Sequence, residues 1–252
     1  MKLMRLVQVA LPGLAALTLV GSGASGAEPL FQSGPGQTAL IELYTSEGCS
    51  SCPPAEAWLA GLRDKPGLWK EFVPVAFHVS YWDSQGWRDP FSSRIYTLRQ
   101  YAQARAWGSS TVYTPCFVRN GREWTLGREP SVAGPPVGLL SLERIGPSRW
   151  RISFQPADSL RVGRVEAHMA LLCGGVSSDV RAGENAGRRL EHEFVVLALK
   201  DAAFGPEDRG RLAADFELEA NFPANALRRA AAAWVTPVGQ MRPIQAVGGW
   251  LQ

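Results

Sequence analysis

The sequence has little excess charge and few thiol or imidazole side chains. Its 252 residues carry a net charge of +3, with four cysteines and three histidines. The arginines are scattered rather than clustered, so a role in binding nucleic acid or an anionic membrane has no basis in the charge pattern. We interpret the charged residues as solvated faces and expect no nucleic-acid partner.

Long hydrophobic runs are also missing. The apolar run over residues 6–20 is shorter than the roughly 20 residues that span a bilayer, and no later run reaches that length. Lys2 and Arg5 precede it and small residues ending at Ala27 follow it, which is the order of a secretory signal peptide. The expected cleavage site has no cysteine, which argues against a lipid anchor there. We therefore expect residues 1–27 to be a signal peptide and the mature chain to be periplasmic or secreted, without a membrane span.

The first half of the mature chain alternates predicted strands and helices. Buried strands are predicted over residues 38–44 and 72–79, and Pro53 opens a helix between them, so the two strands should be parallel. A second helix should bury Phe91, Ile95, Leu98 and Ala102. Asn120-Gly121 predicts a hairpin over residues 114–126. This β-α-β-α-β-β order is that of a thioredoxin core.

The second half of the mature chain is predicted to be β structure. Short strands are predicted over residues 149–155, 164–172, 189–199 and 211–219. The secondary structure of residues 226–235 is not decided by the sequence, because their alanines favour a helix while tertiary context can impose a strand. We predict an α/β thioredoxin-like domain over residues 28–136, followed by a β-rich, sandwich-like domain over residues 137–252.

Cys49 and Cys52 form the only closely spaced cysteine pair. A C-x-x-C disulfide closes a very small loop and is a poor structural staple, so redox chemistry or metal binding is favoured. Because Cys49 should lie at the start of a helix, the helix dipole would lower its thiol pKa and make it the nucleophile, with Cys52 as the resolving thiol.

Further candidate residues follow from their positions in these elements. Thr114 and Pro115 precede a strand where thioredoxin-like proteins place a cis proline, although an ordinary strand-initiating proline is the plain alternative. Glu42 lies inside an apolar strand and would accept the Cys52 proton, or would be an outward-facing acid.

His78 ends the second strand, at the same sheet edge as Cys49. It would relay protons, join Cys49 and Cys52 as a copper or zinc ligand, or be a hydrogen-bonded structural residue. The aromatic residues of the next loop would form a substrate-binding wall or simply pack in the core; they are Tyr81, Trp82 and Trp87. Cys116 and Cys173 would pair with each other, supply a third thiol at the site, or be inert.

Several motifs resemble one family of secreted bacterial proteins. They lie at residues 41–56, 77–83, 86–90, 99–100, 112–115 and 183–188. On these motifs the chain resembles the family called domain of unknown function 1223. The resemblance implies a thioredoxin-like fold with a β-rich C-terminal half. Cys116 departs from the glutamine that the family usually has after Thr-Pro, which adds a thiol beside the expected site.

Three hypotheses about function follow. The first is an exported thiol–disulfide oxidoreductase in which Cys49 attacks a disulfide and Cys52 resolves the mixed disulfide. It needs no cofactor besides its own disulfide, and its partners would be a thiol- or disulfide-containing polypeptide and a redox partner. The second is a periplasmic copper or zinc binding or delivery protein using Cys49, Cys52 and His78. The third is a non-catalytic binding module.

Overall fold

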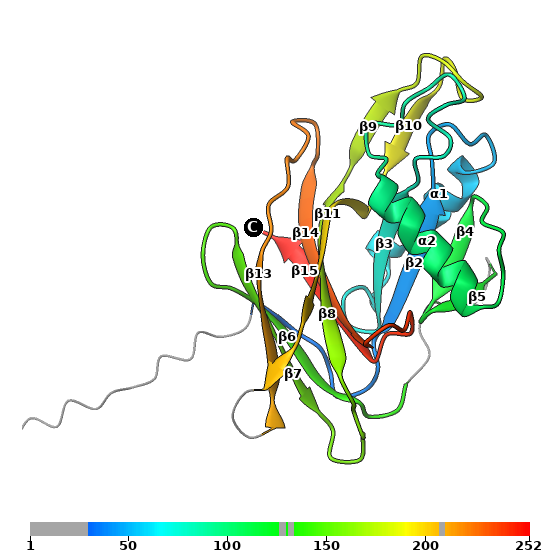
Figure 1. Cartoon of the computed structure of the whole chain (residues 1–252). Helices are drawn as coiled ribbons and strands as arrows, with labels where there is room; N and C mark the ends of the chain where they lie inside the picture. The colour runs from blue at the N-terminus through cyan, green and yellow to red at the C-terminus, as the bar shows by residue number, and fades with distance from the viewer. Residues whose placement is uncertain (1–29, 126–129, 131–133, 207–209) are drawn as a thin grey trace, which may run out of the picture.

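The computed structural model describes residues 30–125, 130, 134–206 and 210–252, so the predicted signal peptide lies outside the described residues. Two α-helices occur in this part of the chain, α1 (Pro53–Ala60) and α2 (Arg94–Ala106), with a 3-10 helix, η1 (Gly61–Asp64), directly after α1. The rest of the regular structure is β-strand (Figure 1). None of the described helices is long and apolar enough to cross a membrane.

An eight-stranded mixed sheet forms the centre of the molecule. In spatial order its strands are β15 (Gln245–Leu251), β14 (Arg228–Pro237), β8 (Val165–Gly174), β11 (Val195–Ala203), β3 (Phe72–His78), β2 (Ala39–Thr45), β4 (Cys116–Arg119) and β5 (Arg122–Trp124). The two halves of the chain meet where β11 pairs with β3, through Val195 opposite Ala76. Strands from both halves therefore share one sheet.

This sheet is strongly curled. Adjacent strands lie about 4.8 Å apart, so a flat sheet would place β15 roughly 24 Å from β2, five strands away. Instead β15 contacts both β2 and β3. Side chains of β14 and β15, such as Trp234 and Ala246, share a buried cluster with Leu40 and Val73. Tyr96 of α2 is part of the same cluster.

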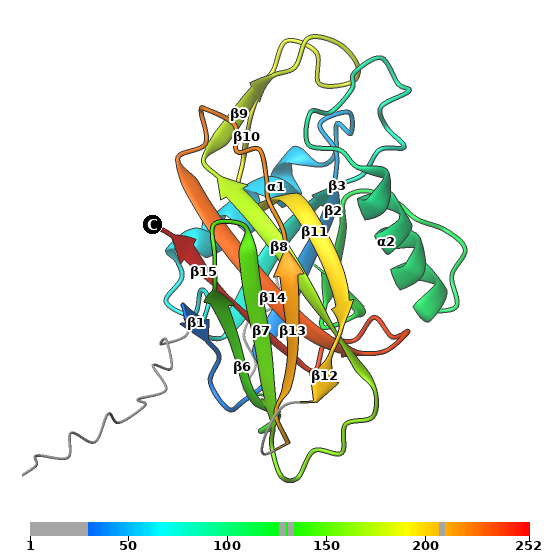
Figure 2. The same ribbon diagram turned by 60° about the vertical axis from the view of Figure 1, so that its left-hand side comes forward.

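A second sheet covers the outer face of β8, β14 and β15. Its order is β1 (Phe31–Gln32), β6 (Gly138–Arg144), β7 (Arg149–Pro156), β13 (Leu212–Glu217) and β12 (Gly205–Pro206). Figure 2 shows it in front of the large sheet. Between the two layers lies a second core that includes Leu142, Phe154, Met169 and Val235. A separate pair, β9 (Val176–Asp179) and β10 (Arg189–His192), forms an antiparallel ribbon.

The predicted fold class, an α/β thioredoxin-like domain followed by a sandwich-like domain, is wrong. The described chain is mainly β, with two short α-helices. The local order of elements agrees with the prediction: β2 and β3 are parallel, α1 lies between them, and β4 and β5 form the hairpin at Asn120-Gly121. Local sequence patterns do not indicate which strand pairs with the free edge of β3, however. In the structure β11 pairs there, and β8, β14 and β15 extend the sheet further. The prediction of a redox-active centre of the thioredoxin type depended on that fold and is wrong with it. The structure shows a Cys49–Cys52 disulfide with its own set of contacts.

The buried face of α2 also differs from the prediction. Ile95 and Leu98, expected in the core, are 58% and 53% exposed. The buried positions include Arg99, Gln100 and Gln103. The helix turns this polar face inward because a buried carboxylate, Glu42, accepts hydrogen bonds from it. An apolar periodicity rule cannot find such a face.

Candidate functional site

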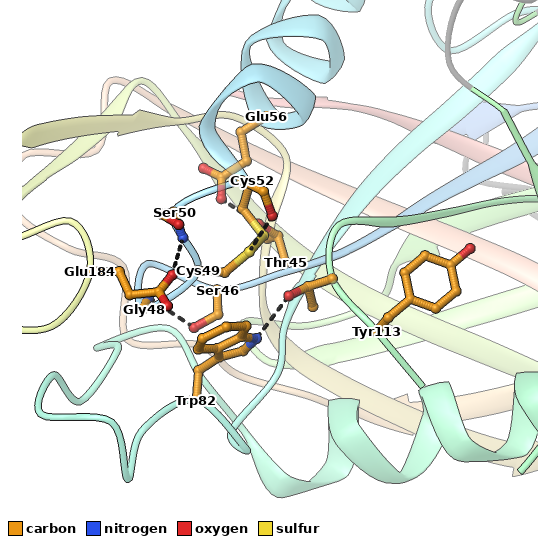
Figure 3. Close-up of a disulfide and its surroundings, with 12 residues drawn as sticks. Thr45, Ser46, Gly48, Cys49, Ser50, Cys52, Glu56, Trp82, Tyr113 and Glu184 are labelled. Carbon is orange, nitrogen blue, oxygen red and sulfur yellow. Dashed lines mark hydrogen bonds between the residues drawn. A yellow bond between two sulfur atoms is a disulfide. The ribbon is translucent and has the colours of Figure 1, made fainter. Parts of the chain in front are cut away.

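A disulfide joins Cys49 to Cys52 in the loop between β2 and α1, with their Cα atoms 5.5 Å apart (Figure 3). Cys52 is the N-cap residue of α1, and prolines occupy the first helical turn. Both cysteines are buried, whereas Ser50 and Ser51 between them are exposed. The Cys49 sulfur lies 3.3 Å from the Ser51 hydroxyl. The disulfide is thus covered by the protein, and only the turn that it closes faces solvent.

The loop between β9 and β10 holds the disulfide loop in place. The backbone N–H of Ser50 donates to Glu184 Oε2 (2.9 Å). Hydrogen bonding from the Ser50 side chain, and then from its backbone, lowers the pKa of the Glu184 carboxyl. Asn185, fully buried, donates from Nδ2 to the carbonyl oxygens of Glu47 (2.8 Å) and Cys49 (3.0 Å). Residues 183–188, one of the family motifs, therefore anchor the cysteine loop from the second half of the chain.

Thr114 and Trp82 lie on another side of the disulfide. The Thr114–Pro115 peptide bond is cis, as expected. The indole N–H of Trp82 donates to the Thr114 hydroxyl (2.8 Å), and the same side chain packs on Gly48, where a Cβ would come within 3.1 Å of Trp82 Cβ. Figure 3 shows Trp82 beside the disulfide and Tyr113 turned away from it. Tyr81 is half-buried against Trp82, with 6.5 Å between ring centroids.

Glu42 does not join this site. It is fully buried and accepts from Arg99 Nε (2.9 Å), Gln103 Nε2 (3.0 Å) and the Tyr44 hydroxyl (2.8 Å). Side chains alternate along β2, and those of Ile41 and Leu43 face α1, so Glu42 points to the opposite face. These contacts make Glu42 part of a structural ion pair with α2, so it is not the acceptor of the Cys52 proton.

The other two cysteines are free and buried. Cys116, on β4, packs in one buried cluster with Tyr44 and Val75, whereas Cys173, on β8, packs in another with Phe91 and Val195. The two thiols are not bonded to each other. Burial raises the thiol pKa of Cys116 to about 11 and that of Cys173 to about 12.

His78 belongs to a buried group of imidazoles and carboxylates that we call the His–carboxylate cluster. Its members are Glu47, Glu56, His78, Asp89 and His192. Each is at most 8% exposed. The cluster lies on the α1 face of β2 and β3 and flanks the disulfide loop, since Glu47 precedes Cys49 and Glu56 is one helical turn beyond Cys52.

Two hydrogen-bonded arrays make up this cluster. In one, His78 Nδ1 lies 2.7 Å from Asp89 Oδ2, which also accepts from the Glu47 backbone N–H (2.8 Å). In the other, His192 lies between two carboxylates, with Nδ1 bonded to Glu56 Oε2 and Nε2 3.1 Å from Glu47 Oε1. Trp87, predicted either to contact substrate or to pack in the core, donates its indole N–H to Glu47 Oε2 (2.7 Å).

The charges in the cluster shift its pKa values. Burial disfavours a charged His192, but the Glu56 and Glu47 carboxylates outweigh that cost and raise its pKa to about 10. Burial likewise opposes the shift at His78, yet Asp89 raises its pKa. The pKa of the Glu56 carboxyl is lowered against the effect of burial, because His192 faces it.

Sequence reasoning assigned no role to Glu47, Glu56, Asp89 or His192. The first three lie inside the family motifs, and His192 is one of only three histidines in the chain. What the sequence does not show is that β10 carries His192 against α1. Among the described residues, Glu56, His78 and His192 form the one group of three potential metal ligands, with ligand atoms within 4.8 Å of one another. Cys49 and Cys52 are not in it, because their sulfur atoms bond to each other.

Fold and site together define a mainly β protein in which a covered disulfide adjoins a buried His–carboxylate cluster. The family model described as "Protein of unknown function (DUF1223)" matches residues 40–236, so the chain belongs to this family, and the resemblance predicted from the motifs is confirmed. No curated protein matches the chain.

Two solved structures resemble it. Protein AGR_C_4864 from Agrobacterium tumefaciens has 22% sequence identity and a TM-score of 0.58, with 84% of this chain and 93% of that chain covered. HBP35 of Porphyromonas gingivalis has 14% identity and a TM-score of 0.57, with 87% of this chain and 76% of that chain covered. At these identities the similarity concerns the fold alone.

Proposed function

We propose that the Cys49–Cys52 pair carries out thiol–disulfide exchange with a polypeptide or small-molecule substrate. The observation that carries this proposal is a disulfide between residues only three apart in sequence. In the loop-entropy treatment, a ring of four residues stabilises a fold by about 2 kcal/mol, against about 4.7 kcal/mol for a 100-residue loop. A disulfide that stabilises so little is better explained by its chemistry.

The surroundings of the pair support the same proposal. Cys52 caps α1, so the positive end of the helix dipole favours a thiolate there or on its neighbour. The Ser51 hydroxyl, 3.3 Å from the Cys49 sulfur, is able to donate to that thiolate. Glu184 acts against ionisation, because its carboxylate takes the Ser50 N–H and adds a negative charge nearby.

The exchange has two steps. In the reducing direction, the Cys49 thiolate attacks one sulfur of a substrate disulfide; a Cys49–substrate bond forms, the substrate S–S bond breaks, and the other substrate sulfur leaves as a thiolate. The Cys52 thiolate then attacks Cys49, which releases the substrate as a dithiol and restores the Cys49–Cys52 bond. Two electrons pass to the substrate, and the reverse sequence oxidises a dithiol.

Access is controlled by the contacts over the pair. Both sulfur-bearing residues are buried, so an incoming group reaches them only when the disulfide loop separates from Glu184 and Asn185. The β-rich half would thereby set the rate of exchange.

An insulin-reduction assay with dithiothreitol tests the proposal. Wild type should accelerate insulin precipitation, Cys49→Ser and Cys52→Ser should not, and Cys116→Ser should match wild type because that thiol is buried and un-ionised. Cys52→Ser should also accumulate a mixed disulfide with a thiol-bearing peptide. Equal activity of Cys49→Ser and wild type would refute the proposal and leave a non-catalytic role for the scaffold.

We also propose that the protein is exported. The support is the charged, apolar and small-residue order of residues 1–27. A mature N-terminus near Glu28 in a periplasmic fraction would agree with export, and an intact Met1 in the cytoplasm would contradict it.

A further inference from the structure

We propose that Glu56, His78 and His192 form a binding site for a divalent transition-metal ion of the zinc class, with Glu47 orienting His192 through its other ring nitrogen. The ligand atoms of the first three residues lie within 4.8 Å of one another, and all three side chains are buried. Two imidazoles with one or two carboxylates are a ligand set that Zn²⁺ uses in proteins. The site is separate from the cysteine pair and does not depend on exchange at the disulfide.

His78 is oriented as a metal ligand. Its Nδ1 is held by Asp89 at 2.7 Å, whereas its Nε2 is buried and has no hydrogen-bond partner. Metal-binding histidines characteristically bond one ring nitrogen to a carboxylate and offer the other to the ion. A buried nitrogen without a hydrogen-bond partner is destabilising, and a bound ion would remove that cost.

His192 supplies the second imidazole. Glu56 faces its Nδ1 and Glu47 faces its Nε2, so in the metal-free protein each ring nitrogen donates a proton to one carboxylate. A metal ion bound by Nδ1 and Glu56 would replace the Nδ1 proton, and the Nε2–H would stay bonded to Glu47. Thr45 donates to Glu56 Oε1 and so orients the carboxylate that would face the ion.

The charge of the cluster favours a cation. It holds three carboxylates, those of Glu47, Glu56 and Asp89, and two imidazoles. Even with both imidazoles protonated one negative charge is left over, and with both neutral there are three. Within the described residues no lysine or arginine forms an ion pair with these carboxylates. A divalent ion on two neutral imidazoles would leave one negative charge, as two protonated imidazoles do, so the cluster can accept the ion in place of its protons without adding buried charge.

A cavity of about 400 Å³ reaches the edge of the cluster at His192. Its charged lining includes Glu191 and Glu193 and also three arginines, Arg63, Arg189 and Arg228. Arg63 and Arg228 both form ion pairs with Glu193. The proposed site is therefore supported by the cluster itself and not by this cavity.

Equilibrium dialysis of the full chain, stripped with a chelator, against Zn²⁺ or Co²⁺ tests the site. Wild type should bind one ion per chain, and the Co²⁺ form should show visible d–d absorption. His78→Gln, His192→Gln and Glu56→Gln should each lower affinity at least tenfold. His168→Gln is the matched control, because His168 lies on β8 and bonds to Asp201 and Thr236 instead. It should bind like wild type.

Two measurements keep the test decisive if a variant fails to fold. X-ray absorption of the zinc-loaded wild type should show nitrogen and oxygen neighbours and no sulfur, and a Cys49→Ser/Cys52→Ser variant should still bind one ion. Absence of stoichiometric binding by folded wild type, sulfur in the first coordination shell, or equal loss of binding in His168→Gln would overturn the proposal.

Discussion

Two buried charged groups lie on opposite faces of β2, and they are built differently. On the α2 face, Glu42 is matched by Arg99, Gln103 and Tyr44, so its carboxylate is fully satisfied. On the α1 face, the His–carboxylate cluster has surplus negative charge and an unpartnered nitrogen on His78. The charge of the first group is balanced, although Arg99 Nη2 and Gln103 Oε1 lack hydrogen-bond partners, and this closed pair fixes α2 on the sheet. The second group, the open cluster, has carboxylates that no lysine or arginine among the described residues pairs with, and this difference in charge marks it as a site.

Removing one partner of the closed pair should have the largest effect. Arg99→Met leaves Glu42 charged and buried, and it also removes the guanidinium that stacks on Phe77 and Trp234. We expect the free energy of unfolding to fall by about 3–5 kcal/mol, measured by urea denaturation. Glu42→Gln/Arg99→Met should lose less than the single variant. A loss below about 1 kcal/mol for Arg99→Met would show that the pair is not the stabilising feature we describe.

Binding of Zn²⁺ to the open His–carboxylate cluster should have the next largest effect on stability. At a free Zn²⁺ concentration 100 times its dissociation constant, the free energy of unfolding should rise by about 2.7 kcal/mol in wild type. The same addition should raise the free energy of unfolding of His192→Gln by no more than about 1.4 kcal/mol, because a ligand is missing and its affinity is at least tenfold lower. Thermal unfolding with and without Zn²⁺ measures this, and an equal rise in both proteins would place the ion elsewhere.

Removing hydrogen bonds between the β9–β10 loop and the disulfide loop should change the rate of disulfide reduction more than the stability of the protein. Asn185→Ala removes two hydrogen bonds to the carbonyl oxygens of Glu47 and Cys49, at the start of the disulfide loop. We expect reduction by dithiothreitol to become about tenfold faster, equivalent to about 1.4 kcal/mol, the order of one net hydrogen bond. Asn225→Ala, which loses one exposed bond to Ser177, is the matched control and should not change the rate. Equal rates for Asn185→Ala and wild type would mean that this loop does not limit access.

The buried single cysteines should show the smallest effect. With thiol pKa values raised to about 11 and about 12, Cys116 and Cys173 are protonated at pH 8, and the thiolate is the form that alkylates. The thiolate fraction grows only as pH approaches these values. We therefore expect no iodoacetamide labelling of either residue in the native protein at pH 8, and full labelling in denaturant, by mass spectrometry. Native labelling of Cys116 would reopen its role as a third thiol at the site.

Local sequence signals predicted most individual elements. The strands β2, β3, β7 and β8 and the Asn120-Gly121 turn, whose residues both have positive φ, lie where expected. The alanine-rich residues 226–235, whose secondary structure the sequence left undecided, lie mostly in strand β14. The strand pairs with β8 on one side and β15 on the other, and burial there outweighs helix propensity. The strand predicted over residues 189–199 is two strands, β10 and β11, which separate at Phe194 with its positive φ.

The sequence by itself determined the pairing of Cys49 with Cys52 at a helix start, the hairpin and the family, because each depends on neighbouring residues. Only the tertiary structure decided the fold class, the inward polar face of α2 and the His–carboxylate cluster. These depend on contacts between distant segments: β11 beside β3, Arg99 with Glu42, and His192 with Glu56 across 136 positions. Such contacts are selected by the burial and charge compensation of the whole chain, and no local pattern encodes them.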